Sequence, residues 1–290
     1  ELTQGLLTML WPNYLRPVPS MTIIQFTPAA GALAQPAFLA RGCPLDSVVQ
    51  NETTCHFQTC HDVWIFPATL ENVSAHSGTD ISAITLDLTL PVPVPLEQLD
   101  LSKLSFYLGG DPWTARELYF WLSDRLAWIE LEIDGTRFRQ PASILKTSGF
   151  AREEALLPYP GNIYSGYRIL QEYFCFPESF LFFHLAGGDW PKQPRAVSAF
   201  KLHFCFERPL PSALKIRQDA FMLNCVPAIN LFHHDSEPVA LTGRQAEYKR
   251  TIGSRFERID TVYDMAGSPF TDLFCSCQGD QSHYSPLKFS

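Results

Sequence analysis

The sequence predicts an α+β fold that is predominantly antiparallel β, with sandwich- or barrel-like subdomains and a few short helices. Charged residues make up 18% of the 290 residues, below the roughly 25% of an average domain. Phe (22 residues) and Pro (23 residues) are both abundant, which is typical of short strands separated by turns. Several segments also alternate apolar and polar residues with the period of two of a half-buried strand.

The first elements along the chain are one helix and three strands. Leucines at helical spacing predict a helix over about residues 2–11, which ends at Pro12. Residues 15–20 contain two prolines and form an extended connector. Strands are expected at 21–27, 55–66 and 81–90, and the last is expected to end at Pro91, Pro93 and Pro95.

A strand at 104–108 leads into a helix near 112–123. Asp111 is the expected N-cap of this helix and Pro112 its first residue. A strand at 128–133 follows, and Asp134-Gly135 predicts a two-residue hairpin turn into 136–138.

The segment 157–185 contains five Phe and four Tyr but few charges. Such a segment must be buried in a core or against a partner. It predicts a helix near 163–174 with one apolar face that belongs to the core and an opposite polar face. The expected apolar face is Ile163, Tyr167, Leu170 and Phe174, and the expected polar face is Ser165, Arg168 and Glu172. We expect much of this aromatic surface to pack the protein's own domains together.

The remaining strands are expected at 180–185, 197–208, 220–226, 238–242, 246–252 and 257–263. Pro209 and Pro211 mark an expected domain boundary. The predicted division is the end of an N-terminal helical segment (1–16), a β-rich domain with both helices near 112–123 and 163–174 (17–208), and an incomplete second β-rich subdomain (209–290).

Charge and hydropathy disfavour two classes of partner. The formal net charge is −8, and the 22 Lys and Arg are scattered rather than gathered into the basic stripe of a nucleic-acid-binding protein. No apolar run approaches the ~20 residues that span a bilayer, so direct membrane insertion is not expected. The first residues lack a signal-peptide pattern and begin without Met, which suggests a fragment from inside a longer protein.

The cysteines leave two cellular compartments open. Eight Cys are present, several within apolar strands, where free thiols act as small hydrophobes in a reducing cytoplasm. The even count, the Trp content and the sequons at Asn51 and Asn72 suggest the alternative of a secreted β-sandwich carbohydrate-binding or hydrolase module. Thiol titration would separate the two.

Three clusters contain residue types that bind metals, but their spacing does not favour a metal site. On a strand, Cys55 and His61 would share one face, with His56 and Cys60 on the other, so they cannot converge on zinc without a sharp turn, and no Gly or Pro lies between them. A zinc protein is a third alternative, which elemental analysis of the purified chain would test. The segment His233-His234-Asp235 is interpreted as a polar loop, and Cys275 and Cys277 as a thiol pair on a strand. No catalytic or phosphate-binding motif occurs. We therefore expect no metal, no cofactor and no catalytic residue, and the sequence does not locate a partner interface.

Several segments, in order, resemble the TssF family of type VI secretion system baseplate subunits. They are ELTQGLLTMLWPNYLRPVPSM (1–21), CHFQTCHDVWIFP (55–67), LSFYLGGDPWTARELYFWL (104–122), LLPYPGNIYSGYRILQEYFCFPESFLFF (156–183), FMLNCVPAINLF (221–232) with Glu237-Pro238, and ERIDTVYDMAGS (257–268). The segment 156–183 is the most specific match. The family's N-terminal helical region and C-terminal domain are not represented, and residues 275–290 diverge.

The resemblance implies a non-catalytic, cytoplasmic bacterial protein recruited to a complex anchored in the inner membrane. TssF pairs with TssG in baseplate wedges, and a wedge holds two TssF copies. The wedges gather around the VgrG hub, bind the adaptor TssK and contact the sheath through TssE. The family is similar to wedge proteins of contractile phage tails. Its implied mechanism is mechanical, because wedge rearrangement starts sheath contraction.

Overall fold

The computed structural model describes most of residues 18–231 and a few short stretches outside them. Within that range the gaps are at 30, 50–53, 158, 160–163 and 191–195, and outside it residues 3, 5–6, 248–249, 273–278 and 281–286 are described. The chain divides into a unit formed by Met21–Asn230 and a second unit formed by Glu1–Ser20 with Leu231–Ser290. Of the helix predicted over 2–11, residues 3, 5 and 6 are described, and they are helical.

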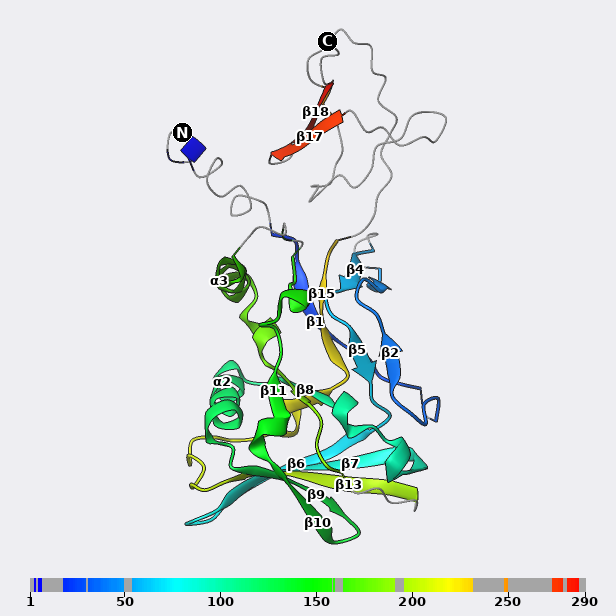
Figure 1. The fold of residues 1–290 in the computed structure, drawn as a ribbon, viewed down its shortest axis with the longest axis vertical. Coiled ribbons are helices and arrows are strands. Elements are labelled where there is room, and N and C mark those ends of the chain that lie inside the picture. Colours follow the sequence, from blue (N-terminus) through cyan, green and yellow to red (C-terminus); the bar gives the residue numbers. More distant parts are fainter. Residues whose placement is uncertain are drawn as a thin grey trace. The chain divides into compact units, whose positions relative to one another are not determined.

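The largest sheet forms where the alternation in the sequence is strictest. It is antiparallel, in the order β10-β9-β13-β7-β6. Every second residue of β7 from Ser82 to Leu90 is buried, which confirms the predicted alternation there. In β13 the predicted inward residues are buried, but His203 and Cys205 on the other side are buried as well. The strands are β6 (Thr69–Ser77), β7 (Ser82–Pro95), β9 (Trp128–Ile133), β10 (Thr136–Pro141) and β13 (Ala196–Phe206). In the Met21–Asn230 unit this sheet lies at the end opposite α3 (Ser165–Cys175) and β4 (His56–Thr59) (Figure 1).

Strand β7 continues through the prolines that were expected to end it, so that prediction was wrong. Its pairing with β6 stops at Thr89, opposite Thr69. Beyond Thr89, β13 is the one described strand that pairs with β7, and their pairing jumps from Ala199–Thr89 to Val197–Val94. A residue without an N–H group is tolerated at such an edge or bulge.

The hairpin and the first long helix form as predicted. Asp134 (φ 48°) and Gly135 (φ 78°) are both left-handed, which is the conformation of a type I′ turn between β9 and β10. Helix α2 (Pro112–Phe120) begins after Asp111, whose Oδ2 accepts a hydrogen bond from the Thr114 N–H at 2.9 Å. A π-helical turn, Trp121–Arg125, extends the helix.

Two further four-stranded antiparallel sheets complete the Met21–Asn230 unit. One has the order β1-β15-β4-β3 and the other the order β11-β12-β8-β14, while β2 pairs with β5. Their strands are β1 (Met21–Gln25), β2 (Ala37–Leu39), β3 (Pro44–Asp46), β4, β5 (Val63–Ile65), β8 (Ser105–Leu108), β11 (Leu145–Thr147), β12 (Phe182–Leu185), β14 (Phe221–Leu223) and β15 (Cys225–Ile229). Short 3₁₀ turns lie at Leu96–Gln98, Leu101–Lys103, Ala142–Ile144, Arg152–Glu154, Pro177–Phe180 and Gln218–Ala220. This β-rich architecture with few short helices confirms the predicted fold class.

The domain boundary expected at 208/209 does not coincide with a division of the described structure. Strand β14 pairs with β8, and β15 pairs with β1 and β4. Residues up to Asn230 therefore belong to the same unit as the preceding sheets.

The single strand expected over 55–66 is two strands, β4 and β5, with a turn between them, so that expectation was wrong. The turn forms because residues 59–62 make hydrogen bonds with residues 40–43. Thr59 Oγ1 donates to the Ala40 carbonyl (3.1 Å) and accepts from the Cys43 N–H (3.0 Å). Asp62 Oδ1 accepts from the Arg41 N–H at 2.8 Å. These distant partners bend the chain where the local sequence shows no Gly or Pro.

Replacing Thr59 by valine is expected to lower the free energy of unfolding by about 2 kcal/mol. Valine keeps the shape of this buried side chain but removes both hydrogen bonds, at about 1 kcal/mol each, to the backbone of the exposed Ala40 and the half-buried Cys43. Thr59→Ser keeps the hydroxyl and should cost clearly less. Urea unfolding of the two variants tests this, and a larger loss for serine than for valine would contradict it.

In the second unit, β17 (Leu273–Gln278) pairs antiparallel with β18 (Gln281–Pro286), and β18 with β16 (Tyr248–Lys249). The segment of Cys275 and Cys277 is a strand, as predicted, and β16 lies within the strand expected at 246–252. The predicted strands at 238–242 and 257–263 lie outside the described residues.

Candidate interaction surface on helix α3

Helix α3 confirms the helix predicted near 163–174 but reverses its predicted orientation. Leu170 and Phe174, expected in the core, are 50% and 81% exposed. Arg168 and Glu172, expected in solvent, are 3% and 1% exposed. Ile163 lies outside the described residues. The apolar side of α3 therefore faces outward, and the prediction that it packs the protein's own core was wrong.

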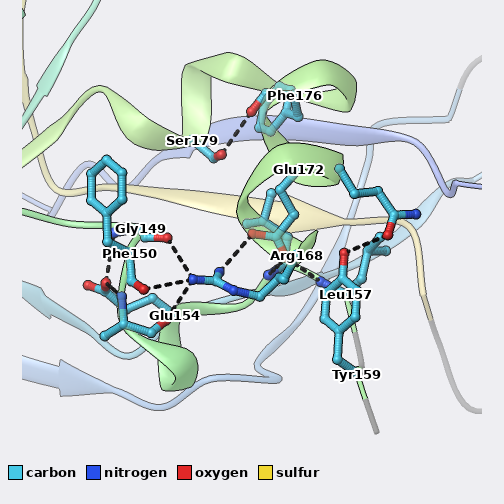
Figure 2. Close-up of polar contacts among 12 residues, drawn as sticks. Gly149, Phe150, Glu154, Leu157, Tyr159, Arg168, Glu172, Phe176 and Ser179 are labelled. Carbon is cyan, nitrogen blue, oxygen red and sulfur yellow. Dashed lines mark hydrogen bonds and ion pairs between the residues drawn. The ribbon is translucent and has the colours of Figure 1, made fainter. Parts of the chain in front are cut away.

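An ion pair between Arg168 and Glu172 accounts for the reversal (Figure 2). The Nη1 of Arg168 lies 2.8 Å from the Oε2 of Glu172, one helical turn away. The Nη2 of Arg168 lies 2.9–3.2 Å from the carbonyl oxygens of Gly149, Phe150 and Ala151. One guanidinium thus neutralises the carboxylate and binds three consecutive carbonyl groups.

Glu172 binds the other end of the same loop. Its Oε1 accepts hydrogen bonds from the N–H groups of Leu156 (2.9 Å) and Leu157 (3.5 Å). Buried backbone groups need such partners. The polar side of α3 faces inward because it supplies partners to the backbone of residues 149–157, which have no partner strand there.

Within this loop, Glu154 closes a local turn. Its Oε2 accepts from the N–H groups of Gly149 (2.7 Å) and Ala151 (3.0 Å). Gly149 has φ +98°, a left-handed conformation that favours glycine, and an added Cβ would lie 3.1 Å from the Phe180 ring. The turn thus presents its carbonyls to Arg168 in a fixed array.

Burial raises the pKa of the Glu172 carboxyl, and Arg168 and the two backbone N–H groups oppose this rise. Removing two charges from water is costly, and a buried pair repays that cost only with good geometry and additional hydrogen bonds. Here the two side chains make five additional hydrogen bonds to backbone groups, while the buried Nε of Arg168 has no hydrogen-bond partner among the described residues. We infer that the pair fixes which side of α3 faces inward.

The outward side of α3 carries mostly aromatic exposed side chains, which we call the α3 face and define as Phe150, Tyr164, Tyr167, Leu170, Tyr173 and Phe174. The Phe180 ring connects Phe150 to Tyr173, with centroids 5.2 and 6.1 Å from theirs. The only charged residues of α3 are Arg168 and Glu172, and both are buried. The exposed surface of this helix therefore carries no charge.

His61, in the turn between β4 and β5, and Arg41, between β2 and β3, also bind the 149–157 loop. The Nε2 of His61 lies 2.6 Å from the carbonyl oxygen of Glu154, and Arg41 Nη1 donates to the carbonyl of Glu153 at 2.9 Å. Burial lowers the pKa of His61, so the neutral ring is favoured in the folded protein. A neutral ring with its proton on Nε2 can donate to Glu154.

Stability is expected to fall as the pH drops below about 6.5, the ordinary pKa of histidine. The folded-state pKa of His61 is lowered, so the unfolded chain binds more protons in that range, and the contribution of His61 present above pH 6.5 is lost. Burial lowers the pKa of His184 and His203 as well, with the same sign. Urea midpoints at pH 7.5 and 5.5 measure the loss, and His61→Gln should reduce it because glutamine can donate without titrating. An unchanged pH dependence in this variant would contradict the role of His61.

The metal-like cluster in the sequence does not come together. His56 Nδ1 lies 2.6 Å from Asp46 Oδ1, whereas His61 binds the backbone near α3. Cys55 is exposed and Cys60 is buried. In the part of the chain that the structure describes, no group of three or more His, Cys, Asp or Glu could hold a metal ion. His233, His234 and Asp235 lie outside it.

The cysteines whose side chains are described are free thiols. They are Cys43, Cys55, Cys60, Cys175, Cys205 and Cys225. Burial raises the pKa of Cys60 and Cys225 to about 12 and that of Cys205 to about 11, so these three remain protonated. The sequon residue Asn72 lies on β6, and Asn51 lies outside the described residues.

None of the helices in the described ranges has both the length and the apolar character needed to cross a bilayer.

Comparisons with known proteins agree on one family. The sequence profile described as "Type VI secretion system, TssF" matches residues 1–263. The chain is 30% identical over 275 residues to "Type VI secretion system component TssF1" of Pseudomonas aeruginosa. The match covers 85% of this chain and 43% of that protein, so the chain spans less than half the length of this curated relative.

Solved structures give the same result. The fold matches a chain of the cryo-electron microscopy structure of a type VI secretion system TssK-TssF-TssG baseplate subcomplex with a TM-score of 0.84 and 26% identity. This match covers 99% of the present chain and 61% of the other. A chain of a type VI secretion system baseplate complex matches with a TM-score of 0.50 and 30% identity, over 83% of this chain and 42% of that one.

Proposed function

Because the chain belongs to the TssF family of the type VI secretion system, we propose that it acts as a structural, non-catalytic wedge component of the baseplate. The observation that carries the proposal is the match of nearly the whole chain to a protein in a TssK-TssF-TssG subcomplex, at 26% identity and a TM-score of 0.84. The function is mechanical in this proposal: the subunit helps to hold the contractile tail in its ready state and transmits the rearrangement that starts sheath contraction.

We propose TssG and TssK as direct partners, because the solved relative is found in a subcomplex with proteins of these names. The proposal extends to TssE, the VgrG hub and a second TssF copy as neighbours in the assembled baseplate. It also places the protein in the bacterial cytoplasm, recruited to a complex anchored in the inner membrane. The resemblance of the sequence to the TssF family supports these additional neighbours and this location.

The α3 face supports an assembly role from the structure itself. An uncharged surface of this aromatic content resembles the centre of a permanent protein interface, which is depleted in charge and enriched in Tyr and Phe. The secreted sugar-binding or hydrolase alternative is not carried further, because the family match covers residues 1–263.

Co-expression with the TssG and TssK proteins of the same bacterium tests the proposal. A tag on TssG should retain both TssK and this chain through size-exclusion chromatography. The full-length protein serves as the positive control, since the chain spans only part of its relatives. Elution of a TssG–TssK complex free of the chain, while the full-length protein is retained, would show that this part does not bind by itself.

A further inference from the structure

The α3 face has the side-chain spacing of a helix packed against another helix. Leu170 is followed by Tyr173 and Phe174 at +3 and +4, and Tyr167 precedes it at −3. Residues at this spacing lie on one side of a helix and repeat every 3.5 residues on average. A row of side chains at this spacing usually packs against the side chains of a second helix that crosses at a shallow angle.

The absence of exposed charge on α3 narrows the chemistry of the partner. A helix that lies on a lipid surface carries Lys or Arg on its polar side, and a nucleic-acid surface needs cations. The two charged residues of α3 are instead buried against each other and against the 149–157 loop. The complementary surface is therefore apolar protein.

The size of the α3 face argues against self-association as its main use. If each aromatic side chain has a full area of about 200 Å², the exposed area of the α3 face is roughly 600 Å². A stable interface buries about 800 Å² on each partner. An 11-residue helix is about 16 Å long, so α3 crossing α3 of a second copy would cover less than this face. A longer helix that also reaches Phe150 would cover all of it.

We propose that the α3 face is the docking site for a helix of a different baseplate subunit, with aliphatic side chains along its apolar side. This inference rests on the proposed function and specifies the surface that carries it. The Arg168–Glu172 pair positions the face by holding the polar side of α3 inward, so little ordering remains when the partner binds. Arg168 and Glu172 are positioning residues, and Leu170 and Phe174 are the residues that touch the partner.

Binding measurements with matched variants test the proposal in the full TssK–TssF–TssG complex. Leu170→Ser and Phe174→Ser should each weaken binding of this chain to the TssG–TssK complex by about 30-fold, as expected of central interface residues. Phe120→Ser is the control, because Phe120 is an aromatic residue on α2 whose 46% exposure is close to the 50% of Leu170, and its effect should stay within about threefold. Circular dichroism should be unchanged in all three, since these side chains are exposed.

Photo-crosslinking identifies the occupant directly. A p-benzoylphenylalanine residue at position 174 in the assembled complex should crosslink to the apolar side of a helix in TssG or TssK, as located by mass spectrometry of the peptides. Crosslinks to a second copy of the chain, to its own sequence, or at no higher yield than from position 120 would overturn the proposal. If the full-length protein does not assemble with TssG and TssK, the proposed function fails; if the wild-type chain assembles and the variants bind equally well, only this inference fails.

Discussion

Replacing Arg168 by methionine is expected to lower the free energy of unfolding by about 3–5 kcal/mol. Methionine has a similar length but leaves the Glu172 carboxylate buried without its counter-ion, and removing one partner of a buried pair costs about this much. It also removes the guanidinium donor from the carbonyls of Gly149, Phe150 and Ala151, of which Ala151 keeps the Glu154 N–H at 3.1 Å. Urea unfolding followed by tryptophan fluorescence measures the change.

Arg116→Met is the matched control for this substitution. Arg116 is an exposed residue on α2, and exposed substitutions usually stay within about 0.5 kcal/mol. A double-mutant cycle with Glu172→Leu then separates the pair from its surroundings. The double variant should lose about 2 kcal/mol less free energy of unfolding than the two single variants lose in sum, because no lone charge remains buried in it. Strict additivity would show that the two side chains do not act together.

Replacing Asn224 by alanine is expected to lower the free energy of unfolding by about 4 kcal/mol. The side chain of Asn224 acts as a strand partner for Phe66: its Oδ1 accepts the Phe66 N–H at 2.7 Å and its Nδ2 donates to the Phe66 carbonyl at 3.1 Å. Both residues are buried, so alanine leaves two backbone groups unsatisfied at about 1–3 kcal/mol each. Asn224 also has φ 57°, which costs alanine about 1 kcal/mol more.

Asn224→Gly separates the two contributions. Glycine accepts the left-handed conformation but makes neither hydrogen bond, so it should recover only about 1 kcal/mol relative to alanine. Urea unfolding of the two variants gives the comparison. Recovery of most of the loss in the glycine variant would show that backbone conformation, and not the bonds to Phe66, makes Asn224 important.

The features that the sequence predicted well depend on residues close together in the chain. The alternation in β7, the Asp134-Gly135 turn and the Asp111 cap each need only a few neighbouring positions, and each forms as expected. Local rules failed where a distant segment decides the outcome. The bend after Thr59 follows contacts with residues 40–43, and β7 passes its prolines because β6 has already ended.

The orientation of α3 shows the same limit at the candidate site. Periodicity reveals that the helix has an apolar side, but it cannot tell whether that side faces the protein's own core or another molecule. Arg168 and Glu172 do stand at i and i+4, the spacing of an ion pair on a helix. Their burial depends on backbone groups of residues 149–157, which no pattern within the helix encodes. Failures of local reasoning are expected to gather at functional sites.

The outward apolar side of α3 also bears on how the chain reaches its native state. A helix of this kind tends to collapse apolar side first, so we expect α3 to be drawn early in folding toward a core from which the native structure excludes it. We expect its polar side to turn inward once residues 149–157 are in place, because Arg168 and Glu172 bind the backbone of those residues in the native structure. Synthesis beside a partner that already offers a complementary helix removes this competition. Production of both chains together, rather than their later encounter, is therefore the expected route to a high yield of native subunit.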